Sequence, residues 1–339
     1  IASAGWLRPY FALPVYALAW GVFIAGWLQL LFQWPALAQI GLVPRPKLNF
    51  SHPGVKRVGV LMLPALLGVS VSQINLLLDT VLATFLQKGS ISWLYYSDRL
   101  LELPLALFGI AIATVILPAL SADYAKSDED RFAAKLDWAI RLVLLFGLPA
   151  SIALVILADV LIATIFYHGA MTQFDLVMAG LSLKAYAAGL TAHMMVKVLA
   201  PGFFARQDMK TPVKIGIIAL VTNMVFNLVL IGFLGHIGLA LATSISAFVN
   251  AFLLWRALSM SSIYRPGAQW LKFIVRIGLA LVLMQGLLLM IVPSLDQWLS
   301  YALEDQILAL FGLCAVGSTL YLITLWLLGL RVSDLRDQI

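Results

Sequence analysis

The sequence predicts an all-α protein that crosses a membrane many times. Of its 339 residues, 62% are hydrophobic and only 11% are charged, whereas about a quarter of a soluble domain is charged. The mean hydropathy is +0.98. The apolar runs are continuous rather than alternating, which favours membrane helices and excludes a β-barrel with a polar lumen. One cysteine and four scattered histidines exclude an intrachain disulfide framework and a histidine-based metal site.

Apolar runs of about 20 residues or more are long enough to span the hydrocarbon core as helices. The sequence contains nine, and we expect a transmembrane helix at each. They are residues 11–34, 58–86, 100–120, 138–166, 173–200, 212–234, 237–258, 270–293 and 305–329.

Lysine and arginine lie mainly on one side of these predicted helices. Of the 22 basic residues, 18 fall in alternate connections, in the adjoining helix ends and in the C-terminal tail; the others are Arg8, Lys88, Arg99 and Lys184. Because basic loops stay in the cytoplasm, this side and the C-terminus are predicted to be cytoplasmic. The net charge of +6 therefore reflects membrane topology rather than nucleic-acid binding.

The first residues of the chain do not resemble a natural N-terminus. The chain begins at Ile1 without a methionine and lacks the charged region and cleavage site of a signal peptide. We therefore expect a fragment whose N-terminal part is absent.

Three charged residues, Asp98, Arg99 and Glu102, are predicted to lie at the outer end of the run 100–120. Their spacing of three and four places them on one helical face. Arg99 would bind an anionic ligand there, with the two carboxylates positioning its guanidinium, because ionisable groups in membrane helices tend to face a cavity or a partner. An interfacial salt bridge beside the tyrosines Tyr95 and Tyr96 explains the spacing equally well.

Polar residues inside three other runs are predicted to lie at one depth. Asp79 and Asn227 are each about seven residues, or roughly 10 Å, from the outer ends of their helices, and Thr243 is about six. Asn223 shares a helical face with Asn227. Carboxylate, amide and hydroxyl oxygens suit a hard monovalent cation such as Na⁺. A proton site at Asp79 and purely structural hydrogen bonding remain alternatives at this stage.

The run 173–200 contains three basic residues, Lys184, His193 and Lys197, and we expect them to have different surroundings. His193 and Lys197 lie within about 40° of each other on the helix, and Lys184 points nearly opposite. Lys197 is close enough to the cytoplasmic end to extend its ammonium to the interface. Lys184 lies deeper and needs a cavity or a partner, which the sequence does not identify.

Three segments resemble the MurJ/MviN family of the multidrug/oligosaccharidyl-lipid/polysaccharide exporter superfamily. They occur in the expected order over most of the chain. They are Leu66–Asn75 (LLGVSVSQIN), Trp93–Leu100 (WLYYSDRL) with Leu117–Ser121 (LPALS), and Leu199–Val213 (LAPGFFARQDMKTPV).

The resemblance implies a fold of fourteen helices, arranged as two six-helix lobes plus two. This chain would then hold the last helix of the N-lobe with a basic linker (1–57), the complete C-lobe (58–258) and two additional helices with a groove for an undecaprenyl chain (259–339). It also implies a cationic cavity between the lobes. Arg99 and its neighbour Asp98 match a cavity motif, and Lys197 matches a basic position near the cytoplasmic gate.

The function that the resemblance implies is the flipping of lipid II, a peptidoglycan precursor, from the cytoplasmic to the periplasmic leaflet of the bacterial inner membrane. We expect alternating access without covalent chemistry, driven by the membrane potential, by Na⁺, or by both. The sequence contains no nucleotide-binding motif, so neither ATP nor a cofactor other than Na⁺ is expected.

Three other functions remain possible from the sequence. They are a flippase for another lipid-linked oligosaccharide, a drug/cation antiporter of the same superfamily, and a membrane enzyme acting on polyprenyl phosphates. Such an enzyme requires clustered acids that bind Mg²⁺, and the only cluster, Asp128–Asp130, has no partner motif. We expect that cluster to be a solvated loop.

Overall fold

The computed structural model describes residues 14–41, 53–54, 73–261, 264, 267 and 269–330. The chain divides into two units, Ile1–Leu61 and Met62–Ile339. In the first unit the apolar segment forms one long helix, α2 (Pro14–Gln39), and Trp20, Phe23 and Trp27 make edge-to-face ring contacts along it.

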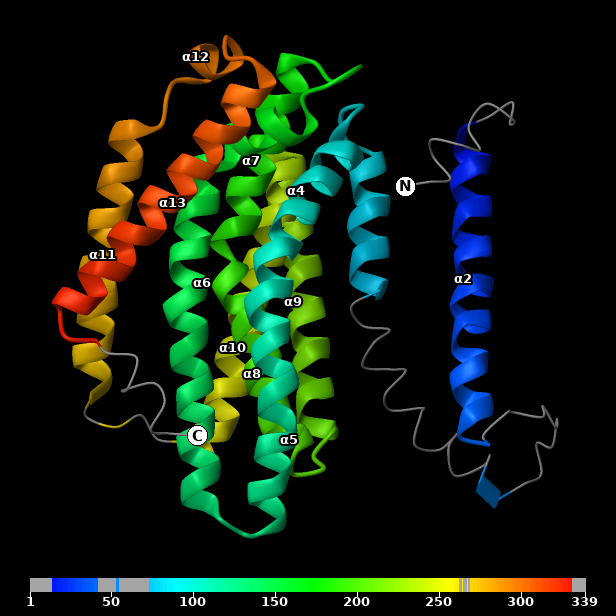
Figure 1. Ribbon diagram of the computed structural model, residues 1–339, viewed down its shortest axis with the longest axis vertical. Helices are drawn as coiled ribbons and strands as arrows, with labels where there is room; N and C mark the ends of the chain where they lie inside the picture. The colour runs from blue at the N-terminus through cyan, green and yellow to red at the C-terminus, as the bar shows by residue number, and fades with distance from the viewer. Residues whose placement is uncertain are drawn as a thin grey trace. The chain divides into compact units, whose positions relative to one another are not determined.

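All regular secondary structure in the described residues of the second unit is helical (Figure 1). It begins with a helix over 73–84 and a turn that ends at Gly89. The following elements are α4 (Ser90–Pro104), the π-helical segment η2 (Leu105–Ile110), α5 (Ala111–Ala125), α6 (Glu129–Phe166), α7 (Gln173–Ala188), α8 (Leu190–Phe204), α9 (Lys210–Leu234), α10 (His236–Met260), α11 (Gln269–Ile291), α12 (Leu295–Leu299) and α13 (Leu303–Leu327).

Two ends of this unit serve as reference points. The short helix α12 and the α6–α7 turn lie together at one end, here named the α12 end, and the α5–α6 turn lies at the other, named the α5–α6 end (Figure 1). Helices α9 and α10 form a hairpin, and α6 contacts α7, α8, α11 and α13. The core of α6, α8 and α10 is built from fully buried side chains such as Leu136, Leu190 and Leu258.

The surface is that of a membrane protein. Within the described residues, eight helices or joined helix pairs are long and apolar enough to cross a membrane. Large apolar side chains are exposed on them; Phe233 is 87% exposed and Leu228 68%. Because water would make this exposure unfavourable, the chain is a multi-pass membrane protein.

The predicted all-α membrane fold is confirmed. The helix start predicted at 138 is nine residues late, because α6 begins at Glu129, and the end predicted at 34 is five residues early, because α2 continues to Gln39. The predicted number of nine spans is not established, because most of the run 58–86 lies outside the described residues and only its helix over 73–84 is seen. The three predicted spans 212–234, 237–258 and 305–329 appear as α9, α10 and α13, each shifted by at most two residues at either end.

The predicted helix start near residue 100 is wrong. Helix α4 begins at Ser90, directly after Gly89, whose φ of 110° only glycine adopts readily. A Cβ at Gly89 would come within 2.6 Å of the Trp93 ring, so the tryptophan covers the turn. Arg99 therefore lies nine residues, or roughly 13 Å, inside the helix rather than at its start.

The predicted continuous helix 173–200 is interrupted at Gly189, between α7 and α8. The Ser244 hydroxyl of α10 donates to the carbonyls of Ala185 at 2.7 Å and Tyr186 at 3.3 Å. A Cβ at Gly189 would lie 2.6 Å from the Ser244 oxygen. The break thus allows α10 to approach the backbone closely, and the hydroxyl satisfies carbonyl groups where the helix is irregular.

We expect Gly189→Ala to lower the free energy of unfolding by about 1–3 kcal/mol, because the methyl group overpacks the contact with Ser244. Thermal unfolding in detergent would measure this. The matched control is Gly216→Ala on α9, where a Cβ would meet nothing within 4 Å. This control substitution should leave the free energy of unfolding unchanged or slightly raised. Equal stability of the two variants would contradict the assigned role of Gly189.

Helices α11 and α13 are fastened to α6. The Tyr321 hydroxyl donates to the Leu145 carbonyl at 2.8 Å. Near the α5–α6 end, Asp137 accepts from Tyr264 Oη at 2.7 Å and Trp270 Nε1 at 2.6 Å, and from Arg141 Nε at 2.6 Å. This buried network joins α6 to the segment that leads into α11.

Candidate functional site

The four predicted oxygen-bearing residues meet at one place between three helices. Asn227 Nδ2 donates to Asp79 Oδ1 at 2.6 Å and to Asn223 Oδ1 at 2.8 Å. Thr243 Oγ1 lies 3.4 Å from Asp79 Oδ2 and 3.2 Å from Asn223 Nδ2. Both asparagines are fully buried and Asp79 is 9% exposed. We name Asp79, Asn223, Asn227 and Thr243 the oxygen cluster.

The oxygen cluster is not fully satisfied by its own hydrogen bonds. Asn227 Oδ1 is buried and has no hydrogen-bond partner among the described residues. The Asn223 amide also fits when rotated by 180°, which places its nitrogen 3.2 Å from Asp79 Oδ1 and its oxygen 3.2 Å from Thr243 Oγ1. A buried acceptor without a donor is unfavourable, and a cation beside it would remove that cost.

The donor set matches a monovalent hard cation better than a transition metal. It contains one carboxylate with amide and hydroxyl oxygens, which hard cations prefer. Among the described residues, no three His, Cys, Asp or Glu side chains gather in a group that could hold a metal ion. The oxygen cluster can therefore bind one small charge, or carry a proton at Asp79.

Asn75 is a residue of this site that the sequence reasoning did not assign. With the Asn223 amide rotated, its nitrogen lies 2.8 Å from Asn75 Oδ1. Asn75 precedes Asp79 by one helical turn on the same helix, so the spacing of four was the available signal.

Arg99 pairs with only one of the two carboxylates predicted to position it. Its Nη1 lies 2.6 Å from Glu102 Oε2, and its guanidinium lies 4.9 Å from the centre of the Tyr95 ring. Both charged side chains are about half exposed. Asp98 makes no ion pair in the part of the chain that the structure describes. The guanidinium is thus oriented by Glu102 and Tyr95 and remains accessible to an anion.

Lys197 is not close to Arg99 along the membrane normal. It is exposed on α8, seven residues before that helix ends towards the α5–α6 end, whereas Arg99 is nine residues from the start of α4, which lies at the α12 end beside the start of α7. The structure therefore places the two predicted cations at different levels.

Lys184 has a partner that the sequence reasoning missed. Its Nζ lies 2.7 Å from Asp159 Oδ2, and both side chains are 34% exposed. A Cβ at Gly180 would overlap Asp159 Oδ1, so this glycine makes room for the carboxylate. Asp159 lies in the apolar run 138–166, and an acid in such a run was the signal that pointed to it.

The segment Leu199–Val213, which carries part of the family resemblance, contains the turn between α8 and α9. Gln207 adopts a φ of 61°, which reverses the chain after α8. Asp208 Oδ1 then accepts from the N–H groups of Lys210 and Thr211 at the start of α9. Desolvation by itself raises the pKa of Asp208, but these hydrogen bonds and the charge of Arg206 outweigh it and lower the pKa below its ordinary value.

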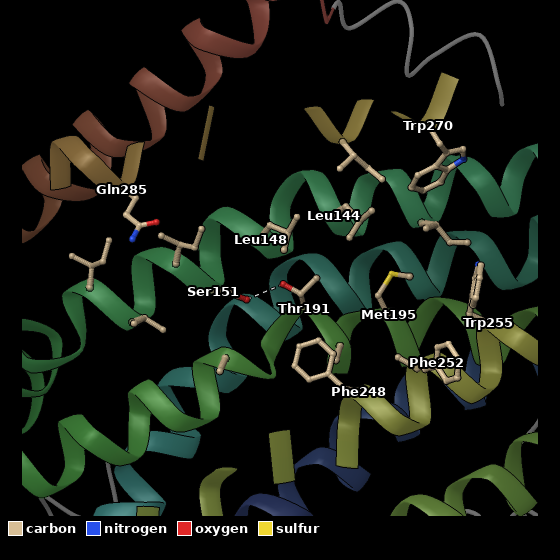
Figure 2. Close-up of a pocket in the computed structure, with 18 of the residues that line it drawn as sticks. Leu144, Leu148, Ser151, Thr191, Met195, Phe248, Phe252, Trp255, Trp270 and Gln285 are labelled. Atoms are coloured by element: carbon tan, nitrogen blue, oxygen red, sulfur yellow. Dashed lines mark hydrogen bonds between the residues drawn. The ribbon is translucent and has the colours of Figure 1, made fainter. Parts of the chain in front are cut away.

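A cavity of about 740 Å³ lies between α6, the junction of α7 and α8, α10 and α11 (Figure 2). Its walls are apolar side chains, including Leu148, Met195 and Phe252, and its polar groups are few. Ser151 and Thr191 hydrogen-bond each other at 2.8 Å on its wall, and Gln285 points towards it from α11. Its volume and lining are typical of a site for an apolar ligand.

Comparison with known proteins identifies the family. A family model described as lipid II flippase MurJ matches residues 1–304. The chain is 48% identical over 336 residues to the probable lipid II flippase MurJ of Vibrio cholerae, covering 99% of this chain and 64% of that relative. It is 38% identical to the lipid II flippase MurJ of Burkholderia cenocepacia, covering 100% of this chain and 66% of that relative. The chain thus spans just under two thirds of these relatives.

Solved structures agree with this assignment. A lipid II flippase MurJ in an inward closed conformation superposes with a TM-score of 0.67 at 27% identity, covering 84% of this chain and 57% of that one. An outward-facing transporter of the MATE family superposes with a TM-score of 0.53 at 18% identity, over 66% of this chain and 51% of that one, and supports the fold alone. The names of the MurJ relatives agree with the transporter class predicted from sequence. The chain belongs to the lipid II flippase MurJ family.

Proposed function

We propose that this chain, as part of its complete protein, moves lipid II from the cytoplasmic to the periplasmic leaflet of the bacterial inner membrane. The observation that carries the proposal is Arg99, a half-exposed guanidinium well inside a membrane-spanning helix. The names of the relatives supply the substrate. A cation at such a position needs a cavity or an anionic partner, and the pyrophosphate of lipid II is such a partner.

In this proposal Arg99 binds the pyrophosphate and Glu102 holds the guanidinium in place. Guanidinium groups bind phosphate oxygens through paired hydrogen bonds. Only one edge of Arg99 is occupied by Glu102, so another edge remains for the ligand. Asp98 and Lys197 complete the proposed set, Asp98 beside Arg99 and Lys197 nearer the α5–α6 end.

The oxygen cluster is proposed to bind Na⁺ and to couple it to transport. Its support is the meeting of Asp79, Asn223, Asn227 and Thr243, with one buried acceptor left over. The membrane potential supplies about 2.3 kcal/mol per charge per 100 mV. Na⁺ entering this site, or the potential acting on the bound complex, would drive a change between states open to either side of the membrane.

The undecaprenyl chain is proposed to follow the surface of α11 and α13. Both helices expose large apolar side chains, among them Val282 at 66% and Phe311 at 71%. The corresponding domain assignment is 1–57 for the end of the N-lobe, 58–258 for the C-lobe and 259–339 for these two helices. The α5–α6 end and the C-terminus would face the cytoplasm, where the basic connections lie.

The test is lipid II translocation in cells depleted of their own flippase, with the complete protein supplied from a plasmid. Translocation that depends on Arg99 supports the proposal. A drug/cation antiporter would instead tolerate loss of the arginine and transport organic cations. A flippase for another lipid-linked oligosaccharide would restore export of that oligosaccharide and leave lipid II on the cytoplasmic side.

A further inference from the structure

The ion pair Lys184–Asp159 lies one helical turn beyond two residues that line the apolar cavity, although neither of its members is itself a lining residue. Asp159 follows Val155 by one turn of α6, and Lys184 precedes Ala188 by one turn of α7. Val155 and Ala188 both line the cavity, and side chains four apart share a helical face. The pair therefore continues the cavity wall towards the α12 end.

Polar groups at this level come from three helices. Asp159 lies seven residues before the end of α6, and Gln285 six before the end of α11, so both are about 10 Å below the helix ends. The Lys184 ammonium lies at the same level, because its Nζ is 2.7 Å from Asp159 Oδ2. No hydrogen bond of Gln285 is present among the described residues, and Lys184 bonds through only one of its three N–H donors.

The opposite part of the cavity is apolar and opens sideways. Phe248 and Phe252 on α10 and Ile274 on α11 line it, and each is more than half exposed. In a membrane this opening between α10 and α11 faces lipid chains. The cavity is thus accessible from the bilayer, with the Gln285 amide at its α12 end and Trp255 and Trp270 at the other.

We propose that this cavity binds one acyl chain of a membrane phospholipid, whose ester and phosphate oxygens accept hydrogen bonds from Lys184 and Gln285. Helix α6 has 38 residues, about 57 Å of helix, which exceeds the roughly 40–45 Å of a bilayer with its headgroups. With α6 centred in the bilayer, a level about 10 Å below its end falls near the boundary between the headgroups and the hydrocarbon. Asp159 neutralises Lys184, so the site accepts a phospholipid without requiring a strongly anionic headgroup.

The ligand is separate from the proposed transport substrate. The cavity is lined by residues of α6, α7, α8, α10 and α11 and by no described residue of α13. The undecaprenyl chain, in contrast, is proposed to follow the surface of α11 and α13. Phospholipid bound here would fill the space between the lobe helices and α11.

The test uses the complete protein, delipidated in detergent and titrated with phosphatidylethanolamine that carries a photoreactive group in one acyl chain. Cross-links are expected at cavity side chains such as Leu148 and Phe252. Ala188→Trp, at an exposed alanine on the cavity wall, should abolish them. Ala315→Trp, at an exposed alanine of α13, is the matched control and should leave them unchanged. Persistence of the cavity cross-links in Ala188→Trp would overturn the proposal.

The polar end of the site is tested with the double variant Asp159→Asn, Lys184→Met, which removes both charges and keeps the side-chain sizes. We expect the double variant to bind the probe about tenfold more weakly, because one charge-assisted hydrogen bond is lost. Lys184→Arg keeps that hydrogen bond and should bind the probe with near-normal affinity. If the double variant changes only the melting temperature, the pair is structural and the proposed headgroup contact is wrong. If undecaprenyl phosphate displaces the probe and unlabelled phosphatidylethanolamine does not, the proposed ligand is wrong, whatever the outcome for lipid II translocation.

Discussion

Replacing Arg99 with alanine is expected to abolish lipid II translocation by the complete protein, and Arg99→Lys to restore part of it. A charge-assisted hydrogen bond contributes about 1.5–3 kcal/mol, so affinity for the pyrophosphate should fall roughly 10- to 100-fold. Lysine keeps the charge but loses the planar, paired hydrogen-bonding geometry. The measurement is the fraction of lipid II exposed to the periplasm in cells depleted of their own flippase.

The matched control is Arg131→Ala, which removes an arginine that is 71% exposed beside Asp128 at the start of α6. The Arg131→Ala variant should translocate lipid II at the normal level. Protein levels and melting temperatures in detergent would show that Arg99→Ala is folded. Normal translocation by both alanine variants would mean that the Arg99–Glu102 pair is only a salt bridge on the surface of α4, and the proposed pyrophosphate site would be wrong.

Replacing Asp79 with asparagine is expected to remove the response of the protein to Na⁺. Saturating Na⁺ should raise the melting temperature of the unaltered protein, because a ligand at about 100 times its dissociation constant stabilises the folded state by about 2.7 kcal/mol. Asp79→Asn should remove this increase and also the Na⁺ dependence of translocation. The substitution keeps the shape of the side chain and removes only the charge that a cation needs.

Asp130→Asn, in the exposed first turn of α6, is the control and should keep the full response to Na⁺. An equal rise in melting temperature with K⁺ or choline would show a general salt effect. Translocation that follows pH but not Na⁺, and is lost in Asp79→Asn, would assign a proton to this site instead. Normal translocation by Asp79→Asn would leave the oxygen cluster a structural hydrogen-bond network.

The apolar part of each described transmembrane helix could be predicted from sequence because hydropathy over about 20 residues is a local property. Helices α9, α10 and α13 match their predicted spans within two residues at each end. The start of α4 could not be predicted in this way. Its first turns contain Ser90, Ser92 and Ser97, which lower the local hydropathy, and the helix is held by the packing of Trp93 on Gly89 and by the hydrogen bond from Ser97 to the Ala179 carbonyl.

The oxygen cluster was the part of the candidate site most accessible to sequence reasoning. Depth along a helix follows from residue count, so Asp79, Asn227 and Thr243 could be placed at one level before their contacts were known. Their rotation about each helix axis, which decides whether they face one another, depends on how the helices pack. The hydrogen bonds from Asn227 and Thr243 to Asp79 supply that information.

By itself the sequence determined an all-α, multi-pass membrane protein, its approximate spans and the residue types of an oxygen-rich cluster, because these follow from composition and from spacing along single helices. Only the tertiary structure decided that Lys184 pairs with Asp159, and that α7 ends at Gly189 under Ser244. Each of these depends on contacts between or around helices, and such contacts are set by packing rather than by local hydropathy.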